Sequence, residues 1–528
     1  MNMARNIQQP AIWQAIALYT VMTAIVLYPV LTVQVPGLGD YLNHLARMHI
    51  LSDIHRSEAL AGFYQLHWQA IPYLAMDATF VVLNKISTIY VAGRIFISIC
   101  IILPVLSVAM LHFAVHRRLS LVPAAAFLFC YNYLLSWGFL NYLCALGLAV
   151  MLFAGWVASA GWPRWPRAAL FCVLALGLYF SHLVAFGAYC LAVGAFELAR
   201  AWRTGFHPWR AITADWLAAG LQAVPAIVFA LSVDVGKPFV GPVLTSFGDL
   251  STKLVALESP VLFFGGRADI LAGVFALLAL ILGLLTGRLR LAPAIWPVAL
   301  AVGAVAVCVP NWLFGTFGMD FRLPLLMVLL LIGATSTTER MGRVFGCALL
   351  GGFLALTALR SAGVATTLRA IDGQIAAVRQ VVGAMPRGMR LLIVDTSTNG
   401  QAGHFGPIRA TAQVGMVAVI DRDAFVPFLF TGLTAVRPAL ALQASSTPHG
   451  SPLRLSDLTE GLGRRDDPAG ETGDGAGRRI YWMGWETKFD YVLIQHFGSR
   501  PAALPANLRL VASSSVADLY KIERPVNP

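Results

Sequence analysis

Eleven apolar stretches, separated by short polar segments, restrict the fold of this chain more than any other feature of its sequence. A helix needs roughly 20 apolar residues to cross about 30 Å of hydrocarbon. With 58% hydrophobic and 12% charged residues, the chain lies outside the range of soluble domains, in which about a quarter of the residues are charged. We therefore expect a polytopic α-helical membrane protein. Its expected spans are 11–33, 91–115, 119–136, 142–160, 167–180, 183–201, 211–232, 268–286, 291–309, 323–336 and 343–360.

Basic residues gather in alternate turns between these spans. Placing the N-terminus in the cytoplasm puts every short basic turn on the inner side, as the positive-inside rule requires. Membrane orientation therefore explains the net charge of +12 better than nucleic-acid binding does. The inner turns contain Arg117, Arg118, Arg164, Arg167, Arg200, Arg203, Arg210, Arg288, Arg290, Arg340 and Arg343.

Two segments allow more than one interpretation. Residues 168–196 are uncharged with arginines near both ends, and only two short crossings that turn near Ser181-His182 keep both basic clusters inside. Residues 67–86 are apolar but contain Asp77 and Lys85, and counting them as a span would reverse every later loop. We interpret them as an amphipathic helix at the outer interface, within a long first outer loop at about 34–90.

In the C-terminal part, residues 361–528, the long apolar runs give way to the alternating apolar and polar residues of a soluble domain. We predict a helix at 364–384, a loop at 444–479 rich in Gly, Ser and Pro, and a small extracytoplasmic α/β fold. The remainder of the chain, 1–360, would form the membrane module. Predicted strands are 389–395, 412–420, 490–495, 508–513 and 517–522.

A short polar run follows the first span. Asp40 is the first ionisable residue after Arg5, and spacings of four and seven residues place Asp40, His44 and Arg47 on one face of a helix. An acid, an imidazole and a permanent cation would thus lie together at the membrane boundary. Such a trio suits a phosphorylated, lipid-borne substrate.

This order of parts resembles the GT-C superfamily of integral-membrane glycosyltransferases. The likeness consists of a first span, a long outer loop that opens with an acid and carries two helices, many further spans, and an outer C-terminal domain. The matching residues are Asp40, Arg47, Tyr73 to Asp77 and Val91 to Arg94. Most of the chain also resembles a group of bacterial membrane proteins without an assigned activity. These share strings similar to Asp40 to Arg47, Leu140 to Tyr142 and Phe425 to Phe430.

The resemblance implies roles for the first-loop residues. Asp40 would be the general base that deprotonates an acceptor hydroxyl, or a ligand for a divalent cation such as Mg²⁺ or Mn²⁺. Many GT-C members carry an acidic pair here, whereas Asp40 is followed by Tyr41, so the use of a metal stays open. Arg47 would neutralise the phosphate leaving group, and His44 would orient Asp40 or bind the acceptor. The structural alternatives are a helix N-cap for Asp40 and a solvated helix face for His44 and Arg47.

Four further residues are candidates for substrate binding. Asp320 and Arg322 lie between two spans on the outer side, where they would form an ion pair within the turn or Arg322 would bind a second phosphate oxygen. His182, at the tip of the predicted hairpin, is a structural residue or a substrate ligand. For Asp77, the spacing of residues along the helix reveals no partner.

The resemblance implies a bacterial plasma-membrane enzyme that moves a sugar from a polyprenyl-phosphate carrier to an envelope glycan or lipid acceptor outside the membrane, with inversion of the anomeric carbon. No glycine-rich phosphate loop is present, so no nucleotide is expected. A lipid or polysaccharide transporter or flippase is the first alternative, which would place ionisable residues near the centres of several spans. A noncatalytic scaffold for envelope assembly is the second.

Overall fold

The computed structural model describes residues 12–232, 245–313, 316–396, 410–431, 434–447, 452–459, 481–497, 499–501 and 503–524. These residues form two compact units. The first unit holds residues 12–32, 96–232 and 245–366, and the second holds residues 33–95 and those after 366. The boundary predicted at residue 360 between a membrane module and a separate domain stays a prediction.

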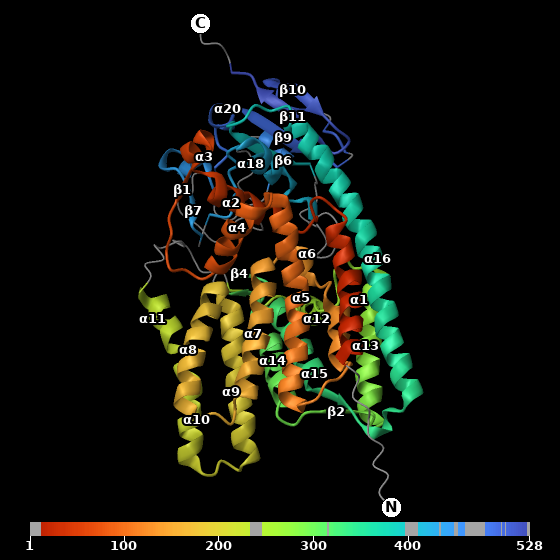
Figure 1. The fold of residues 1–528 in the computed structure, drawn as a ribbon. Coiled ribbons are helices and arrows are strands. Elements are labelled where there is room, and N and C mark those ends of the chain that lie inside the picture. Colours follow the sequence, from red (N-terminus) through yellow and green to blue (C-terminus); the bar gives the residue numbers. More distant parts are fainter. Residues whose placement is uncertain are drawn as a thin grey trace, which may run out of the picture. The chain divides into compact units, whose positions relative to one another are not determined.

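Apolar helices build the first unit (Figure 1). Two of its helices, α5 (Ile89–His116) and α16 (Arg343–Val382), also contain residues of the second unit. Two short antiparallel strand pairs lie between helices of this unit: β2 (Leu289–Leu291) with β5 (Thr335–Thr337), and β3 (Trp312–Leu313) with β4 (Thr316–Phe317). The other helices are α1 (Ile12–Leu31), η1 (Val122–Phe129), α6 (Tyr133–Trp137), α7 (Leu140–Ala158), α8 (Arg164–Ser181), α9 (Leu183–Arg203), α10 (Trp209–Leu221), α11 (Val224–Ser232), α12 (Leu250–Glu258), α13 (Arg267–Leu285), α14 (Trp296–Cys308), α15 (Met319–Ala334) and η2 (Glu339–Met341).

Within the described residues, seven helical segments are long and apolar enough to cross a membrane: Ile12–Leu31, Ile89–His116, Leu140–Ala158, Leu183–Arg203, Trp209–Ser232, Arg267–Leu285 and Arg343–Val382. Of the other expected spans, 291–309 contains the shorter apolar helix α14, and 167–180 and 323–336 fall on α8 and α15. The chain is therefore a polytopic helical membrane protein, as predicted. The expected span at 119–136 is instead divided into η1 and α6, because Asn132 accepts a hydrogen bond from the Leu135 amide and starts a new helix.

The predicted turn between two short crossings is confirmed at His182. Helix α8 ends at Ser181 and α9 begins at Leu183, with His182 between them in an extended conformation. Its ring nitrogen Nδ1 accepts a hydrogen bond from the Val184 amide at 3.1 Å, which caps the second helix. Helices α8 and α9 then pack against each other (Figure 1).

The second unit combines the first loop with the C-terminal residues. The loop contains the two predicted helices, α2 (Tyr41–Asp53) and α4 (Leu74–Ile86), and also α3 (Glu58–Phe63). Strand β1 (Tyr64–Leu66) pairs antiparallel with β7 (Val436–Pro438) from the C-terminal part. Shorter C-terminal helices are η3 (Val414–Met416), α18 (Val417–Arg422), η4 (Leu440–Ser445), α19 (Leu455–Thr459) and α20 (Trp485–Lys488).

A five-stranded sheet forms the C-terminal core, with the strand order β10-β11-β9-β6-β8. Strand β6 pairs parallel with β8 and β9, whereas β9, β11 and β10 pair antiparallel. The small α/β fold is therefore confirmed, with four of its five predicted strands. The strands are β6 (Leu391–Asp395), β8 (Leu453–Arg454), β9 (Tyr491–Gln495), β10 (Leu508–Ser513) and β11 (Ala517–Ile522).

The predicted strand at 412–420 is wrong, because these residues form η3 and the first part of α18. All residues from Val414 to Ile420 are buried, and an apolar run without periodicity does not distinguish a strand from a buried helix. The predicted helix at 364–384 also has no separate start, since α16 is continuous from Arg343 to Val382. Of the predicted loop at 444–479, residues 448–451 and 460–479 lie outside the described residues.

Candidate functional site

Asp40 stands at the N-cap position of α2. Its side chain does not make the N-cap hydrogen bond, and its backbone has φ −90° and ψ −3° in place of the extended conformation usual for that position. The residue is partly exposed, although Tyr41 and Leu42 directly after it are buried. Capping therefore does not account for the acid at this position, and the carboxylate lies at the positive end of the α2 dipole.

Arg47 and Asp77 form a buried ion pair that joins α2 to α4. The Arg47 Nη2 atom lies 2.8 Å from Asp77 Oδ1, and the two side chains are 3% and 2% exposed. Burial raises the pKa of Asp77, and the nearby Arg47 charge opposes that rise. Arg47 is thus the partner of Asp77 that spacing along one helix did not reveal. The Asp77 carboxylate in turn compensates the Arg47 charge.

His44 lies on α2 between Asp40 and Arg47. Its ring packs edge-to-face against Phe430, with 5.4 Å between the ring centroids. Its Nδ1 atom is buried and makes no hydrogen bond within the described part of the chain. Burial, and then the Arg47 charge, lower the pKa of His44 to about 3. The imidazole is therefore neutral near pH 7 and is suited to hydrogen bonding, not to charge compensation.

Asn43 is a site-supporting residue that sequence reasoning missed. It is fully buried, and its Nδ2 atom donates to Gln413 Oε1 at 3.1 Å and to the Phe428 carbonyl at 3.0 Å. Its Oδ1 atom accepts from the Phe430 amide at 2.8 Å. The string from Phe425 to Phe430, which the sequence singled out without a role, therefore fixes α2 next to His44.

A second attachment holds the far end of α2. The His49 Nε2 atom lies 3.0 Å from Asp423 Oδ1, and Arg387 binds the other oxygen of that carboxylate at 2.8 Å. These contacts lower the pKa of Asp423, with His49 as the larger cause. Helix α2 is thus fastened along its length by residues from after position 366.

In the first unit, Asp320 does not pair with Arg322. The Asp320 carboxylate is fully buried, and it accepts hydrogen bonds from Lys253 Nζ at 2.9 Å and from Asn311 Nδ2 at 2.8 Å. The interpretation of these residues as an ion pair within the turn is therefore wrong. A lysine 67 positions away supplies the compensating charge.

Arg322, His182 and Tyr142 lie together. The Arg322 guanidinium lies over the Phe139 ring at 4.7 Å and donates to the Phe317 carbonyl at 2.6 Å. The Tyr142 hydroxyl donates to the Arg322 carbonyl at 2.7 Å, and its ring packs against His182 at 5.3 Å. Because His182 also caps α9, its contacts fit the structural interpretation best.

Metal binding at Asp40 stays untested. Across the described residues, no group of three or more His, Cys, Asp or Glu side chains is placed to hold a metal ion.

Comparisons with known proteins define the fold. No family profile and no curated protein sequence matches the chain. A crystal structure of ArnT from Cupriavidus metallidurans, bound to undecaprenyl phosphate, aligns with 97% of this chain and 98% of its own, with a TM-score of 0.52 and 11% identity. The chain has the fold of ArnT. The GT-C fold expected from the sequence is thereby confirmed.

A second solved structure, the cryo-EM structure of the arabinofuranosyltransferase AftD from mycobacteria, aligns with 98% of this chain and 40% of its own. Its TM-score is 0.48, with 15% identity.

Proposed function

We propose that this chain is a membrane glycosyltransferase that moves a sugar from a polyprenyl-phosphate carrier to an acceptor hydroxyl on the extracytoplasmic face. The observation that carries the proposal is the ArnT fold over 97% of the chain. The ArnT structure contains undecaprenyl phosphate, which is the class of lipid that such a donor would carry. Asp40 is partly exposed at the start of α2, where the helix dipole favours the ionised carboxylate that a general base requires.

Asp40 would act as the general base. It would accept the proton of the acceptor hydroxyl while the hydroxyl oxygen attacks the anomeric carbon of the donor. The bond from that carbon to the phosphate oxygen would break, and its electron pair would leave with the polyprenyl phosphate. A single direct displacement would invert the anomeric configuration.

Within the first unit, Arg322 would bind the phosphate of a polyprenyl lipid. The residue is 6% exposed, and its guanidinium is oriented by Phe139 and by the Phe317 carbonyl. A planar guanidinium with several donors matches the geometry of phosphate oxygens. Asp320 would not compete for it, because Lys253 and Asn311 hold that carboxylate.

Arg47 and His44 would have supporting roles. Because Asp77 compensates its charge, Arg47 would hold α2 against α4 and contribute less to the leaving phosphate than the sequence suggested. The neutral His44 would offer Nδ1 to an acceptor hydroxyl or to Asp40.

The purified protein in liposomes, given a polyprenyl-phosphate sugar labelled in the sugar, tests the proposal. We expect the label to appear on an added glycan or lipid acceptor, or in water as slow hydrolysis, together with free polyprenyl phosphate. Movement of the intact labelled lipid between leaflets, without loss of the sugar, would instead identify a flippase and overturn the proposal.

An Arg322→Gln variant tests the phosphate role separately. It should weaken the binding of polyprenyl phosphate. An Arg267→Gln variant, which removes an exposed arginine at the start of the apolar helix α13, is the matched control.

A further inference from the structure

Charged side chains are unusually concentrated at one end of α8, α9 and α10. Helix α8 begins at Arg164, α9 ends at Arg203, and α10 begins at Trp209. Since α8 and α9 are joined by the turn at His182 and α9 and α10 pack against each other, the start of α8, the end of α9 and the start of α10 lie toward the same end of this group of helices (Figure 1). Ionisable groups inside apolar helices are costly and call for an explanation.

The inner part of this cluster anchors the helices. Glu197 is 3% exposed and accepts hydrogen bonds from Trp156 Nε1 at 2.9 Å and from Arg200 Nη1 at 2.6 Å. The Arg167 guanidinium lies 3.3 Å from the centre of the Trp156 ring and 3.9 Å from Glu197. These contacts fix the position of Arg200 from inside the bundle.

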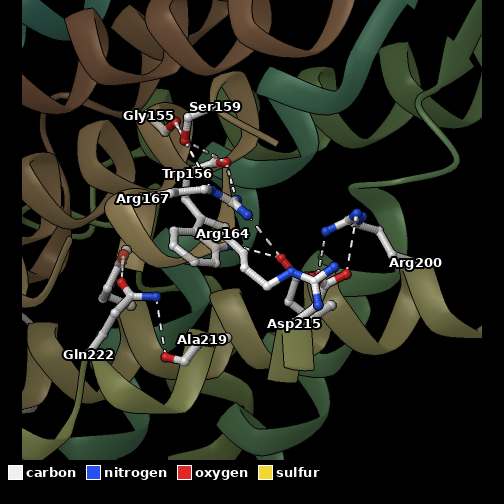
Figure 2. Close-up of polar contacts among 11 residues, drawn as sticks. Gly155, Trp156, Ser159, Arg164, Arg167, Arg200, Asp215, Ala219 and Gln222 are labelled. Atoms are coloured by element: carbon white, nitrogen blue, oxygen red, sulfur yellow. Dashed lines mark hydrogen bonds and ion pairs between the residues drawn. The ribbon is translucent and has the colours of Figure 1, made fainter. Parts of the chain in front are cut away.

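The outer part carries an excess of positive charge. Figure 2 shows Arg164 and Arg200 directed at the same carboxylate, that of Asp215, with ion-pair distances of 3.6 and 4.0 Å. The two arginine side chains are 39% and 35% exposed. Both distances lie near the limit of an ion pair, so neither guanidinium is saturated by Asp215. The three arginines of the cluster, Arg164, Arg167 and Arg200, face two acids, Glu197 and Asp215, which leaves a net positive charge, and Arg164 and Arg200 are accessible.

Exposed tryptophans surround these arginines. Trp162 and Trp165 flank Arg164, and Trp202 and Trp209 lie at the facing ends of α9 and α10, with exposures of 57%, 56%, 74% and 64%. Tryptophan favours the level of lipid headgroups, because its ring is apolar and its N–H is polar. We call the whole set the Arg–Trp surface: Trp162, Arg164, Trp165, Arg200, Trp202, Arg203, Trp209 and Arg210.

We propose that the Arg–Trp surface binds the headgroup of an anionic phospholipid. The lipid phosphate would lie against Arg164 and Arg200, and the tryptophan rings would lie between headgroups and acyl chains. Charge complementarity selects this partner, since Arg203 at the end of α9 and Arg210 at the start of α10 add two exposed positive charges. Basic clusters between helices near the membrane surface bind anionic headgroups in this way. The inference is independent of the proposed enzyme activity.

Lipid titration of the purified full-length protein in detergent tests the proposal. Native mass spectrometry would count bound phosphatidylglycerol and phosphatidylcholine. Wild type should retain phosphatidylglycerol preferentially, and Arg164→Gln and Arg203→Gln should each weaken that retention about fivefold, which corresponds to about 1 kcal/mol per basic residue. Neither Arg164 nor Arg203 is among the residues that bind Glu197. Asp215→Asn should strengthen retention, an effect opposite in sign to any loss of folding.

Arg343→Gln is the matched control, because Arg343 is an exposed arginine at the start of another apolar helix. It should leave phosphatidylglycerol retention unchanged. Equal retention of phosphatidylcholine, an equal loss in Arg343→Gln, or weaker retention in Asp215→Asn would each overturn the proposal. Unfolding temperatures of all variants, measured without added lipid, separate lipid loss from misfolding.

Discussion

Replacing Arg47 with methionine should destabilise α2 and α4 strongly, because the change removes one half of a buried ion pair. The two charges are 2.8 Å apart and nearly inaccessible to water. At an effective dielectric constant of about 20, their attraction is about 6 kcal/mol. Desolvation of both groups offsets part of it, and breaking such a pair on one side costs about 3–5 kcal/mol.

The loss should depend on pH. Burial already raises the pKa of Asp77, and without Arg47 nothing on α2 opposes that rise. The folded variant would then bind a proton that the unfolded chain releases. Its stability should therefore fall as pH rises, with a larger loss at pH 8 than at pH 5.

Thermal unfolding of the purified protein in detergent at pH 5 and pH 8 measures the effect. The double variant Arg47→Met with Asp77→Leu should recover most of the lost stability, since no uncompensated charge stays buried. Arg56→Met is the control, because Arg56 is 82% exposed and its 3.4 Å contact with Asp53 is worth about 0.5 kcal/mol. The reasoning would be refuted if the double variant lost as much stability as Arg47→Met and Asp77→Leu lose in sum.

Three further changes have defined outcomes. Asn43→Ala removes three hydrogen bonds of a buried side chain and should cost about 2–4 kcal/mol, with faster hydrogen exchange confined to α2 and its neighbours. Unchanged exchange would show that these bonds do not hold α2 in place. Because the pKa of His44 is lowered to about 3 in the folded protein, only the unfolded chain takes up a proton at His44 between about pH 6.5 and pH 4, and stability falls with pH there. His44→Gln should make this fall less steep. An unaltered dependence of the unfolding temperature on pH would count against burial of the ring. Lys253→Met leaves the Asp320 carboxylate buried without its cation and should lower the unfolding temperature more than Lys253→Arg does; equal effects would show that the charge is not needed.

The membrane helices were predictable because hydropathy and arginine placement act locally. The hairpin at His182 followed from keeping basic clusters on one side, and the structure ends α8 and starts α9 there. The error at 412–420 arose where burial on every side removes periodicity. The continuity of α16 was missed because the change in polarity near Ser361 resembles the end of a membrane helix. No proline interrupts α16 there.

The candidate site was predictable only where residues share one helix. Spacing placed Asp40, His44 and Arg47 on one face of α2, but it said nothing of partners distant in sequence. Asp77 lies 30 positions after Arg47, and Phe428 lies 385 positions after Asn43. Such pairs depend on tertiary packing, which no local pattern encodes. The pairing of Asp320 with Lys253 was missed for the same reason.

The central claim is that the Asp40 carboxylate removes the acceptor proton. The most direct measurement compares the rate of sugar transfer from a labelled polyprenyl phosphate by wild type, Asp40→Asn and Asp53→Asn, the last being the same change at the other end of α2. The account predicts a loss of about 10²–10⁴-fold in Asp40→Asn at unchanged unfolding temperature, and near wild-type transfer in Asp53→Asn. Undiminished transfer by Asp40→Asn would contradict it.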